Sequence, residues 1–304
     1  MKNKPGLWIA ALVMAVMIGG ICVMSVGRAA ENGYASWSFD FAFAKSASLK
    51  NTIELSAQEI SSLKLEYGSK NIKVYPASGE KIIIKEYLYS NQSKAQATVT
   101  YPEKDQAVVT GGKLQTIVFF GFSSEKIEVY VPEKVLSVLS IQTGSGNIEY
   151  NGVDVAEASF QAGSGNIKIE DMKGDITVQT GSGNISGDSL CGKLSARAGS
   201  GNITLTGFEG SGAIATGSGN VRVEAASVTG DMEMQTGSGN IKLEIPEKLS
   251  FHLEIQTGSG SIKTDFDEVL SYNKKGNSAE GNVGAMPEIN IRLKANSGNV
   301  RVIY

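Results

Sequence analysis

The second half of the chain alternates apolar and polar residues in short runs on either side of a recurring Gly-Ser-Gly turn. When the copies are aligned on the first residue of the turn, the position three before it and the position four after it are always apolar. These positions hold Ile141, Phe160, Val178, Ala196, Ile214, Met234, Ile255 and Leu293 before the turn, and Ile148, Ile167, Ile185, Ile203, Val221, Ile241, Ile262 and Val300 after it. A period of two is that of a β-strand with one buried face. The pattern therefore predicts pairs of short strands whose apolar side chains face inward.

The turn itself recurs at a nearly constant interval. Gly-Ser-Gly-Asn occurs six times verbatim, 18 to 20 residues apart, starting at Gly144, Gly163, Gly181, Gly199, Gly217 and Gly237, and related motifs start at Gly258 and Asn296. Two short strands cannot bury an apolar face alone, whereas parallel stacking of successive copies supplies hydrogen bonds and a continuous core. We therefore expect an all-β fold, a parallel β-solenoid of about 18–20 residues per coil, stacked in sequence order. The glycines are expected to supply positive φ angles at the turns.

The asparagines of the turns recur once per coil, at Asn147, Asn166, Asn184, Asn202, Asn220, Asn240 and Asn299. Asparagine suits turns because it tolerates the left-handed region and bonds local backbone groups. We expect these residues to form a structural ladder of stacked side-chain amides. A rival interpretation is calcium binding, as in nonapeptide β-rolls, but that repeat needs aspartate carboxylates and a second glycine-rich loop per coil. The pattern thus predicts neither a metal site nor a cofactor.

Polar residues between the apolar positions are expected to face solvent. Before the turn they are Gln142, Gln161, Gln179, Arg197, Gln235 and Gln256, with Lys294 in the last copy. After the turn they include Glu149, Lys168, Thr204, Arg222, Lys242, Lys263 and Arg301. We take the first row, Gln142 to Gln256, as a candidate outward binding face.

The repeat region is expected to span residues 136–304, with a mobile loop inserted at 265–288. Upstream, Leu63–Val74 reproduces the pattern around a degraded Gly-Ser-Lys-Asn turn, which indicates an early coil. Longer strands follow, up to Val131. Because the open end of such a stack exposes unpaired strand edges, we interpret residues 51–135 as an N-terminal β region that combines this early coil with a cap. Residues 31–50 are expected to be a linker.

The N-terminus, residues 1–30, has the pattern of a short cytoplasmic stub followed by a transmembrane signal-anchor. Lys2 and Lys4 precede an uncharged run of 20 residues from Leu7 to Val26, which as a helix would cross a hydrocarbon core of roughly 30 Å. Positive charge before the span predicts an extracytoplasmic C-terminal domain on a single-pass anchor in the cell membrane. The alternative is secretion after signal cleavage near Gly27–Ala29, although cleaved signals have shorter apolar stretches, of about 7–15 residues.

The charge of the chain and the placement of its acidic residues argue against two classes of function, nucleic-acid binding and catalysis. The net charge is −3 and the basic residues are dispersed, so nucleic acid is not an expected partner. The close acidic pairs of the repeat region are Glu170-Asp171 and Asp265/Asp267, and the sole histidine is His252. Glycan-processing β-helix enzymes need convergent carboxylates, whereas adjacent strand residues point to opposite faces. We therefore expect no enzymatic activity and assign no catalytic residues.

At its repeated turns the chain resembles the putative adhesin family of bacterial cell-envelope proteins, a domain of unknown function whose members combine an N-terminal membrane segment or signal with Gly-Ser-Gly-Asn/Asp-Ile repeats. The resemblance covers roughly residues 51–304. It implies a surface-exposed β-solenoid and, for some relatives, a part in the envelope-stress systems of Gram-positive bacteria. It supplies no catalytic residues.

Together these features predict a membrane-anchored, extracytoplasmic, non-enzymatic protein that acts as an adhesin-like binding or scaffold module of the cell envelope. Its expected partners are the membrane, through the N-terminal helix, and a cell-wall glycan or an envelope protein. Two alternatives stay open: an accessory regulator of an envelope-stress sensing system, and a glycan-processing β-helix enzyme.

Overall fold

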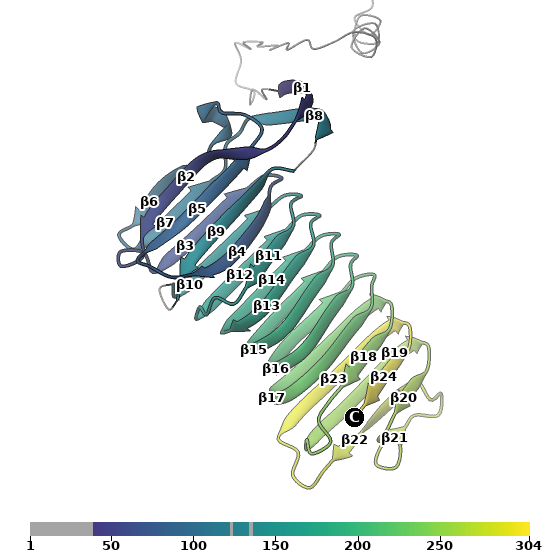
Figure 1. The fold of residues 1–304 in the computed structure, drawn as a ribbon. Helices are drawn as coiled ribbons and strands as arrows, with labels where there is room; N and C mark the ends of the chain where they lie inside the picture. The colour runs from purple at the N-terminus through teal and green to yellow at the C-terminus, as the bar shows by residue number, and fades with distance from the viewer. Residues whose placement is uncertain (1–38, 122–123, 134–135) are drawn as a thin grey trace, which may run out of the picture.

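The computed structural model describes residues 39–121, 124–133 and 136–304, and over these ranges the chain is all-β, as the sequence predicts (Figure 1). The described strands form a 2-stranded sheet and a 22-stranded sheet. The predicted membrane span at Leu7–Val26 lies outside the described residues. Within the described ranges, no helix has the length and apolar character needed to cross a membrane.

The first nine strands and one short 3-10 helix precede the repeats. They are β1 (Phe39–Lys45), β2 (Ser48–Ser56), β3 (Ser62–Tyr67), β4 (Asn71–Ala77), β5 (Lys81–Leu88), η1 (Ser93–Ala95), β6 (Thr98–Glu103), β7 (Gln106–Thr110), β8 (Gln115–Gly121) and β9 (Lys126–Pro132). β1 and β8 form the separate 2-stranded parallel sheet. Residues 31–50, expected to be a linker, thus contain β1 and the start of β2, because both segments find strand partners.

The repeats supply the remaining strands. These are β10 (Val138–Thr143), β11 (Ile148–Asn151), β12 (Glu157–Ala162), β13 (Ile167–Lys173), β14 (Asp175–Thr180), β15 (Ile185–Ala198), β16 (Ile203–Thr216), β17 (Val221–Ser238), β18 (Ile241–Glu244), β19 (Phe251–Ser259), β20 (Ile262–Thr264), β21 (Ser271–Tyr272), β22 (Ser278–Val283), β23 (Ile289–Ser297) and β24 (Val300–Ile303). β15, β16 and β17 are long because the chain keeps its strand pairing through the second bend of the coil.

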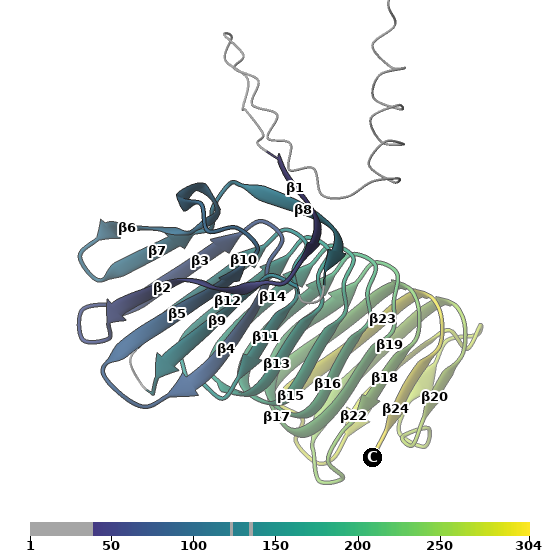
Figure 2. The same ribbon diagram turned by 45° about the horizontal axis from the view of Figure 1, so that its top comes forward.

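Successive coils stack with equivalent residues in register (Figures 1 and 2). We name each level of the stack by the first residue of its turn. Strands that precede the turn, such as β10, β12 and β14, form the first face, and strands that follow it, such as β11 and β13, form the second face. Ile148, for example, pairs in parallel with Ile72 on one side and Ile167 on the other.

The levels do not follow sequence order at the two ends of the stack, which corrects the expectation of simple sequential stacking. β23 lies between β17 and β19, and β24 lies between β18 and β20. The Asn296 level is therefore inserted between the Gly237 and Gly258 levels. At the other end, β7 and β9 lie outside β3 and β4. Because all copies share the same inward positions, the repeat pattern alone does not determine which copies become neighbours.

Antiparallel strands border both ends. At the C-terminal end, β22 pairs antiparallel with β19, and β21 pairs with β22. Residues 265–288, expected to be a mobile loop, thus contain two strands and the buried side chains Phe266 and Ala279. At the N-terminal end, β5 pairs antiparallel with both β9 and β2, and β6 with β7. These strands cover parallel edges that would otherwise present unpaired backbone groups.

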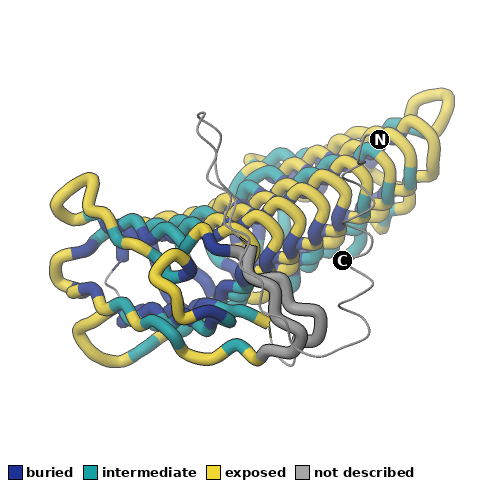
Figure 3. The backbone as a smooth tube through the Cα atoms, turned by 90° about the horizontal axis from the view of Figure 1, so that it is seen from above, coloured by how far each residue is buried: buried dark blue, intermediate teal, exposed yellow. Residues whose placement is uncertain are grey.

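The core is a continuous column of apolar side chains between the two faces, whereas most exposed residues lie on the outside of the coils (Figure 3). The predicted inward isoleucines Ile148, Ile167, Ile185 and Ile203 are each at most 1% exposed. Their strands form because alternation places every second side chain in this column. The predicted strand faces are therefore confirmed at these positions.

The glycines of the central turns serve close stacking and not positive φ, which corrects the sequence-based explanation there, whereas Gly239, Gly260 and Gly298 in the last three turns have positive φ, of 159°, 157° and 147°. A Cβ atom on Gly183 would lie 1.9 Å from the carbonyl oxygen of Gly165, and one on Gly165 would lie 1.7 Å from that of Gly146. Neither Gly165 nor Gly183 has a positive φ. The left-handed residues lie instead at the second bend, where Asp171 has φ 51° and Ser189 has φ 54°.

Buried threonines just before the turns bind neighbouring levels together. The Thr180 hydroxyl donates to the Gly165 carbonyl at 2.9 Å and accepts the Gly183 N–H at 3.2 Å. Thr216 donates in the same way to Gly201 at 2.7 Å. These hydroxyls satisfy backbone groups inside the turn that would otherwise be buried without a partner.

We expect Thr180→Val to lower the free energy of unfolding by about 2 kcal/mol, because it leaves two buried backbone groups without their partner while preserving side-chain shape. Thr177→Val, an exposed position on the same strand, should change it by less than about 0.5 kcal/mol. Denaturant melts of both variants measure the difference. Equal losses would contradict the role assigned to the Thr180 hydroxyl.

Candidate functional site

The asparagines of the turns form a directional ladder along one edge of the stack. The backbone N–H of Asn166 donates to the Asn147 side-chain oxygen at 2.8 Å, and that of Asn184 donates to the Asn166 oxygen at the same distance. The series runs from Asn71 through Asn147, Asn166, Asn184, Asn202, Asn220, Asn240 and Asn299 to Ser261. Backbone-to-amide bonds therefore dominate, and amide-to-amide hydrogen bonds of the expected kind add to them from Asn184 to Asn166 and from Asn240 to Asn220, each at 3.3 Å. Because each side-chain oxygen accepts a backbone N–H of the next level, asparagine has a structural role at these positions.

The candidate binding face predicted from Gln142, Gln161, Gln179, Arg197, Gln235 and Gln256 lies on the first face. The structure brings Gln142, Gln161, Gln179 and Arg197 onto adjacent paired strands. Ala215 separates Arg197 from Gln235. Lys294 then lies between Gln235 and Gln256, because the Asn296 level is inserted there. The row is thus contiguous over four levels and interrupted after them.

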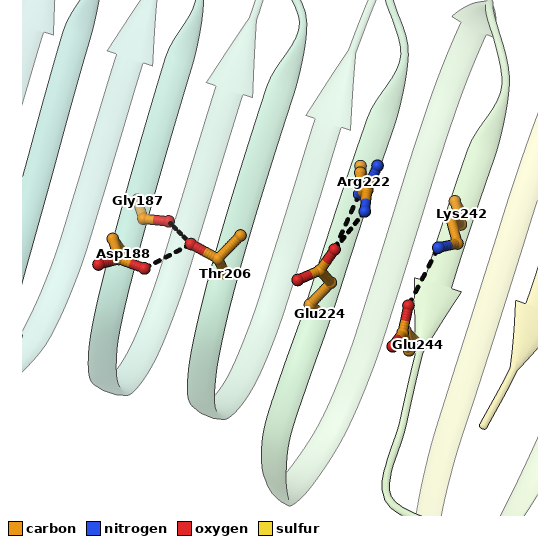
Figure 4. A network of polar contacts seen from close by, with 7 residues as sticks. All are labelled: Gly187, Asp188, Thr206, Arg222, Glu224, Lys242 and Glu244. Atoms are coloured by element: carbon orange, nitrogen blue, oxygen red, sulfur yellow. Dashed lines mark hydrogen bonds and ion pairs between the residues drawn. The ribbon is translucent and has the colours of Figure 1, made fainter.

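The second face carries cations that are paired with carboxylates on the same strand. Lys242 Nζ lies 3.0 Å from Glu244 Oε2, and Arg222 Nε donates to Glu224 Oε1 at 3.1 Å (Figure 4). Residues two apart on a strand share a face, so each pair neutralises itself locally. Toward the end of the stack, Lys242, Arg301 and Lys263 stand on neighbouring strands.

A shallow hollow of about 490 Å³ lies on the first face, where small residues leave room between β14 and β23. Its lining includes the small residues Thr177, Ser195, Gly212 and Ala213, and charged residues such as Asp231. Asp231 Oδ1 accepts the Asn290 backbone N–H at 2.8 Å. This backbone hydrogen bond, with a second from the Asn290 side chain, lowers the pKa of Asp231. The hollow combines both charge signs and is open to solvent.

A cluster of aromatic and basic side chains covers the outward side of β4, β9 and β5. We call it the Tyr–Lys patch; it consists of Lys73, Tyr75, Lys85, Tyr87, Lys126, Glu128 and Tyr130. Strand register places these residues side by side: Tyr75 next to Tyr130, Lys85 opposite Glu128, and Tyr87 opposite Lys126. The sequence analysis missed this patch because its strands lie outside the repeats and far apart in the chain.

Glu128 is the centre of the Tyr–Lys patch. Its carboxylate accepts Lys126 Nζ at 2.7 Å and the Tyr130 hydroxyl at 3.0 Å. Desolvation by burial raises the pKa of Glu128, but hydrogen bonds from Lys126, Tyr130 and Tyr87 outweigh it and hold the pKa below its ordinary value. The carboxylate therefore stays ionised and fixes three side chains around it.

Tyr130 should make stability depend on alkaline pH. Burial, followed by the hydrogen bond and charge of Glu128, raises the pKa of Tyr130 from 10.0 to about 12. A raised folded-state pKa contributes stability that is complete below pH 10 and is lost as the pH rises to about 12. We expect Tyr130→Phe to reduce the fall in melting temperature over this window. If the melting temperature of Tyr130→Phe fell as much as that of the unmodified chain, this explanation would be wrong. Tyr101→Phe, which changes an exposed tyrosine, serves as the control.

The weighed catalytic candidates do not converge. Glu170 pairs with Lys168 at 2.5 Å, and Asp171 is exposed at the second bend. His252 Nδ1 lies 2.7 Å from Asn282 Oδ1 across β19 and β22. Tyr272 bonds Asp267 at the border of the stack. In the ranges that the structure describes, no group of three or more His, Cys, Asp or Glu residues is placed to hold a metal ion.

Comparison with known proteins places these features in context. The family model described as Toastrack DUF4097 matches residues 60–303, well over half of the chain. No match to a curated protein was found.

Several solved structures match this chain over most of its length. One is described as a putative adhesin from Bacteroides fragilis, with 14% identity over 86% of this chain and 100% of that chain, and a TM-score of 0.52. A putative lipid binding protein from Parabacteroides distasonis has 15% identity over 85% and 99%, with a TM-score of 0.47. A putative adhesin from Parabacteroides merdae has 13% identity over 86% and 100%, with a TM-score of 0.44. At 14% identity, the likeness to the Bacteroides fragilis protein is one of fold alone.

Proposed function

The chain belongs to the Toastrack DUF4097 family, and from this premise we propose that it is a membrane-anchored, extracytoplasmic and non-enzymatic binding or scaffold protein of the cell envelope. In this proposal the repeats form a parallel β-solenoid with one coil per Gly-Ser-Gly turn. The N-terminal segment holds this solenoid away from the membrane. The binding role is adhesin-like: the outer faces of the rod hold a glycan or protein of the envelope.

The observation that carries this proposal is the fixed array of polar side chains on the rod. Gln142, Gln161, Gln179 and Arg197 are exposed on adjacent strands whose backbones are hydrogen-bonded on both sides. Neighbouring strands lie about 4.8 Å apart, so donors and acceptors repeat at a short, constant spacing. Such a surface loses little conformational freedom when a partner binds, which favours recognition of an extended ligand.

The site chemistry supports binding over catalysis. Carboxylates of the second face, such as Glu170 and Glu224, pair with cations on their own strands. A general acid and base would need two such groups directed at one point. The extracytoplasmic location is supported by the uncharged run at Leu7–Val26 behind Lys2 and Lys4. The adhesin description of the Bacteroides fragilis protein, whose fold is similar, agrees with the proposed role.

Expression of the full chain in bacterial cells tests the proposal. We expect it to sediment with membranes, to be cleaved by protease added to intact cells, and to co-sediment with isolated cell walls after detergent extraction. Recovery in the cytosolic fraction would overturn the location. Failure to retain any wall or envelope component, or release of reducing ends from wall glycans by the pure protein, would overturn the non-enzymatic binding role.

A further inference from the structure

The Tyr–Lys patch has the composition of a ligand site, although the repeats that define the fold do not contribute to its three strands. It lies on the second face near the N-terminal end of the stack, where β4, β9 and β5 run side by side (Figures 1 and 2). Its tyrosines Tyr75, Tyr87 and Tyr130 are all partly exposed. Aromatic side chains with a polar tip are typical of binding surfaces, since they offer a large contact area and a hydrogen-bonding group.

We propose that the Tyr–Lys patch binds an acidic polysaccharide, with sugar rings against Tyr75 and Tyr130 and acidic groups of the polymer at Lys85. This inference rests on the proposed envelope-binding function and names its ligand class and its site.

The ring geometry suits a chain of sugars. The Tyr75 and Tyr130 rings are 5.6 Å apart between centroids and inclined by only 31°. They form a nearly continuous aromatic strip across two strands. The apolar C–H faces of sugar rings can pack on such a strip while their hydroxyl groups stay in water. Because both tyrosines stand on paired strands, the strip is ordered before the ligand arrives.

The charge of the patch favours an acidic polymer. Lys73 pairs with Glu149 at 2.6 Å, and Lys126 pairs with Glu128. Lys85 Nζ lies 4.8 Å from the Tyr130 ring centroid and has no carboxylate partner within the described residues. Three lysines against two glutamates leave one surplus positive charge, and it is located beside the aromatic strip. A carboxylate or phosphate of the ligand would gain a charge-assisted contact there.

The surroundings leave room for a polymer to continue. Immediately after Tyr75 and Tyr130, the ends of β4 and β9 line a hollow of about 490 Å³ with Pro76, Ala77 and Pro132, followed by Ser78, Gly79 and Glu133. This hollow extends the strip in the direction of the strands. A bound chain can therefore pass over the two rings and into the hollow.

The strand pairing argues against an extended peptide as the ligand. β4 is paired with β9 and β11, β9 with β4 and β5, and β5 with β9 and β2. None of these three strands has a free edge. Peptides that bind sheets as an added strand require such an edge for their main-chain hydrogen bonds. Recognition here must instead come from side chains, which matches a ligand read by ring faces and acidic groups.

Titration calorimetry of the full chain in detergent with polygalacturonate, an acidic glycan, tests this inference. We expect binding that weakens about tenfold in Tyr75→Ala, since one lost ring contact of about 1.4 kcal/mol corresponds to that factor. Lys85→Gln should weaken it about threefold at low salt, with the difference shrinking as salt screens the ammonium. Lys242→Gln, also on the second face but outside the patch, should bind as the unmodified chain does.

Dextran and polyglutamate are the comparison ligands, as a neutral glycan and an acidic peptide. Binding of either as tightly as polygalacturonate would overturn the assignment, as would unchanged binding by Tyr75→Ala with the melting temperature of the unmodified chain. Co-sedimentation with cell walls separates this inference from the proposed function. If Tyr75→Ala and Lys85→Gln keep full wall binding, the patch is not the site, while the envelope-binding role stands.

Discussion

Ile185→Asp is expected to unfold its coil and to lower the free energy of unfolding by about 4–5 kcal/mol, because it buries a charge without a partner. Ile185 is 1% exposed and stands in register between Ile167 and Ile203 in the central column. All of its side-chain neighbours along the stack are apolar, so no donor is available for a carboxylate. Chemical denaturation followed by circular dichroism measures the loss.

The matched control is Gln179→Ala, which removes an exposed side chain on a neighbouring strand. Its effect should stay within about 0.5 kcal/mol. Ile185→Ala provides a milder substitution that keeps folded protein to measure, with an expected loss of about 3 kcal/mol in the free energy of unfolding. Similar losses for the inward and outward substitutions would contradict the assignment of the two sides of the strands.

Gly183→Ala should lower the free energy of unfolding by about 3 kcal/mol, although it adds only one methyl group, at a buried position of the turn. The added Cβ would lie 1.9 Å from the Gly165 carbonyl oxygen and 2.5 Å from its carbon. Both atoms belong to the backbone of the neighbouring level, which is held by the asparagine ladder and cannot move aside locally. Thermal melting of the purified variant is the measurement.

Gly68→Ala is a control in the turn of the early coil, at the first turn position, which is that of Gly181 in the repeats. A Cβ at Gly68 would meet nothing within 4 Å, because the level outside it lacks a matching turn. We expect Gly68→Ala to leave the melting temperature unchanged or slightly raised, since alanine restricts the unfolded chain more than glycine does. A loss at Gly68 equal to that at Gly183 would show that backbone conformation, and not contact between levels, requires these glycines.

Local pattern was sufficient to predict the strands and their inward side chains. Positions such as Ile167 and Ile203 follow from a period of two, which depends only on neighbouring residues. The order of the levels could not be predicted in this way. The Asn296 and Gly258 copies offer nearly the same inward residues, so their exchange costs little in the core and is decided by the connecting segment. The strands β21 and β22 were missed because their residues are mostly polar, so no run of alternating apolar residues marks them.

The candidate sites likewise differ in how far the sequence could predict them. The row from Gln142 to Arg197 was predictable because it belongs to the repeat and inherits its register. The Tyr–Lys patch was not, since Tyr75, Tyr87 and Tyr130 come from three strands whose pairing reverses direction between β5 and β9. A usable signal was present in the alternation of Lys73, Tyr75, Lys85 and Tyr87 with buried residues, which places bulky polar side chains on the outside of adjoining strands.

β23 and β24 lie between strands that precede them in the sequence, and this affects how the protein folds during its synthesis. During synthesis, residues 251–264 leave the ribosome before residues 289–303, yet they occupy the outer position. The gap beside β17 and β18 must therefore stay open, or be filled provisionally, until the later strands arrive and intercalate. Appending further copies after Ile303 would not simply add coils at the outer end, because Ile303 pairs with Glu244 inside the stack and the outer position belongs to β19 and β20. The order in which the strands are threaded therefore decides which of them end the rod.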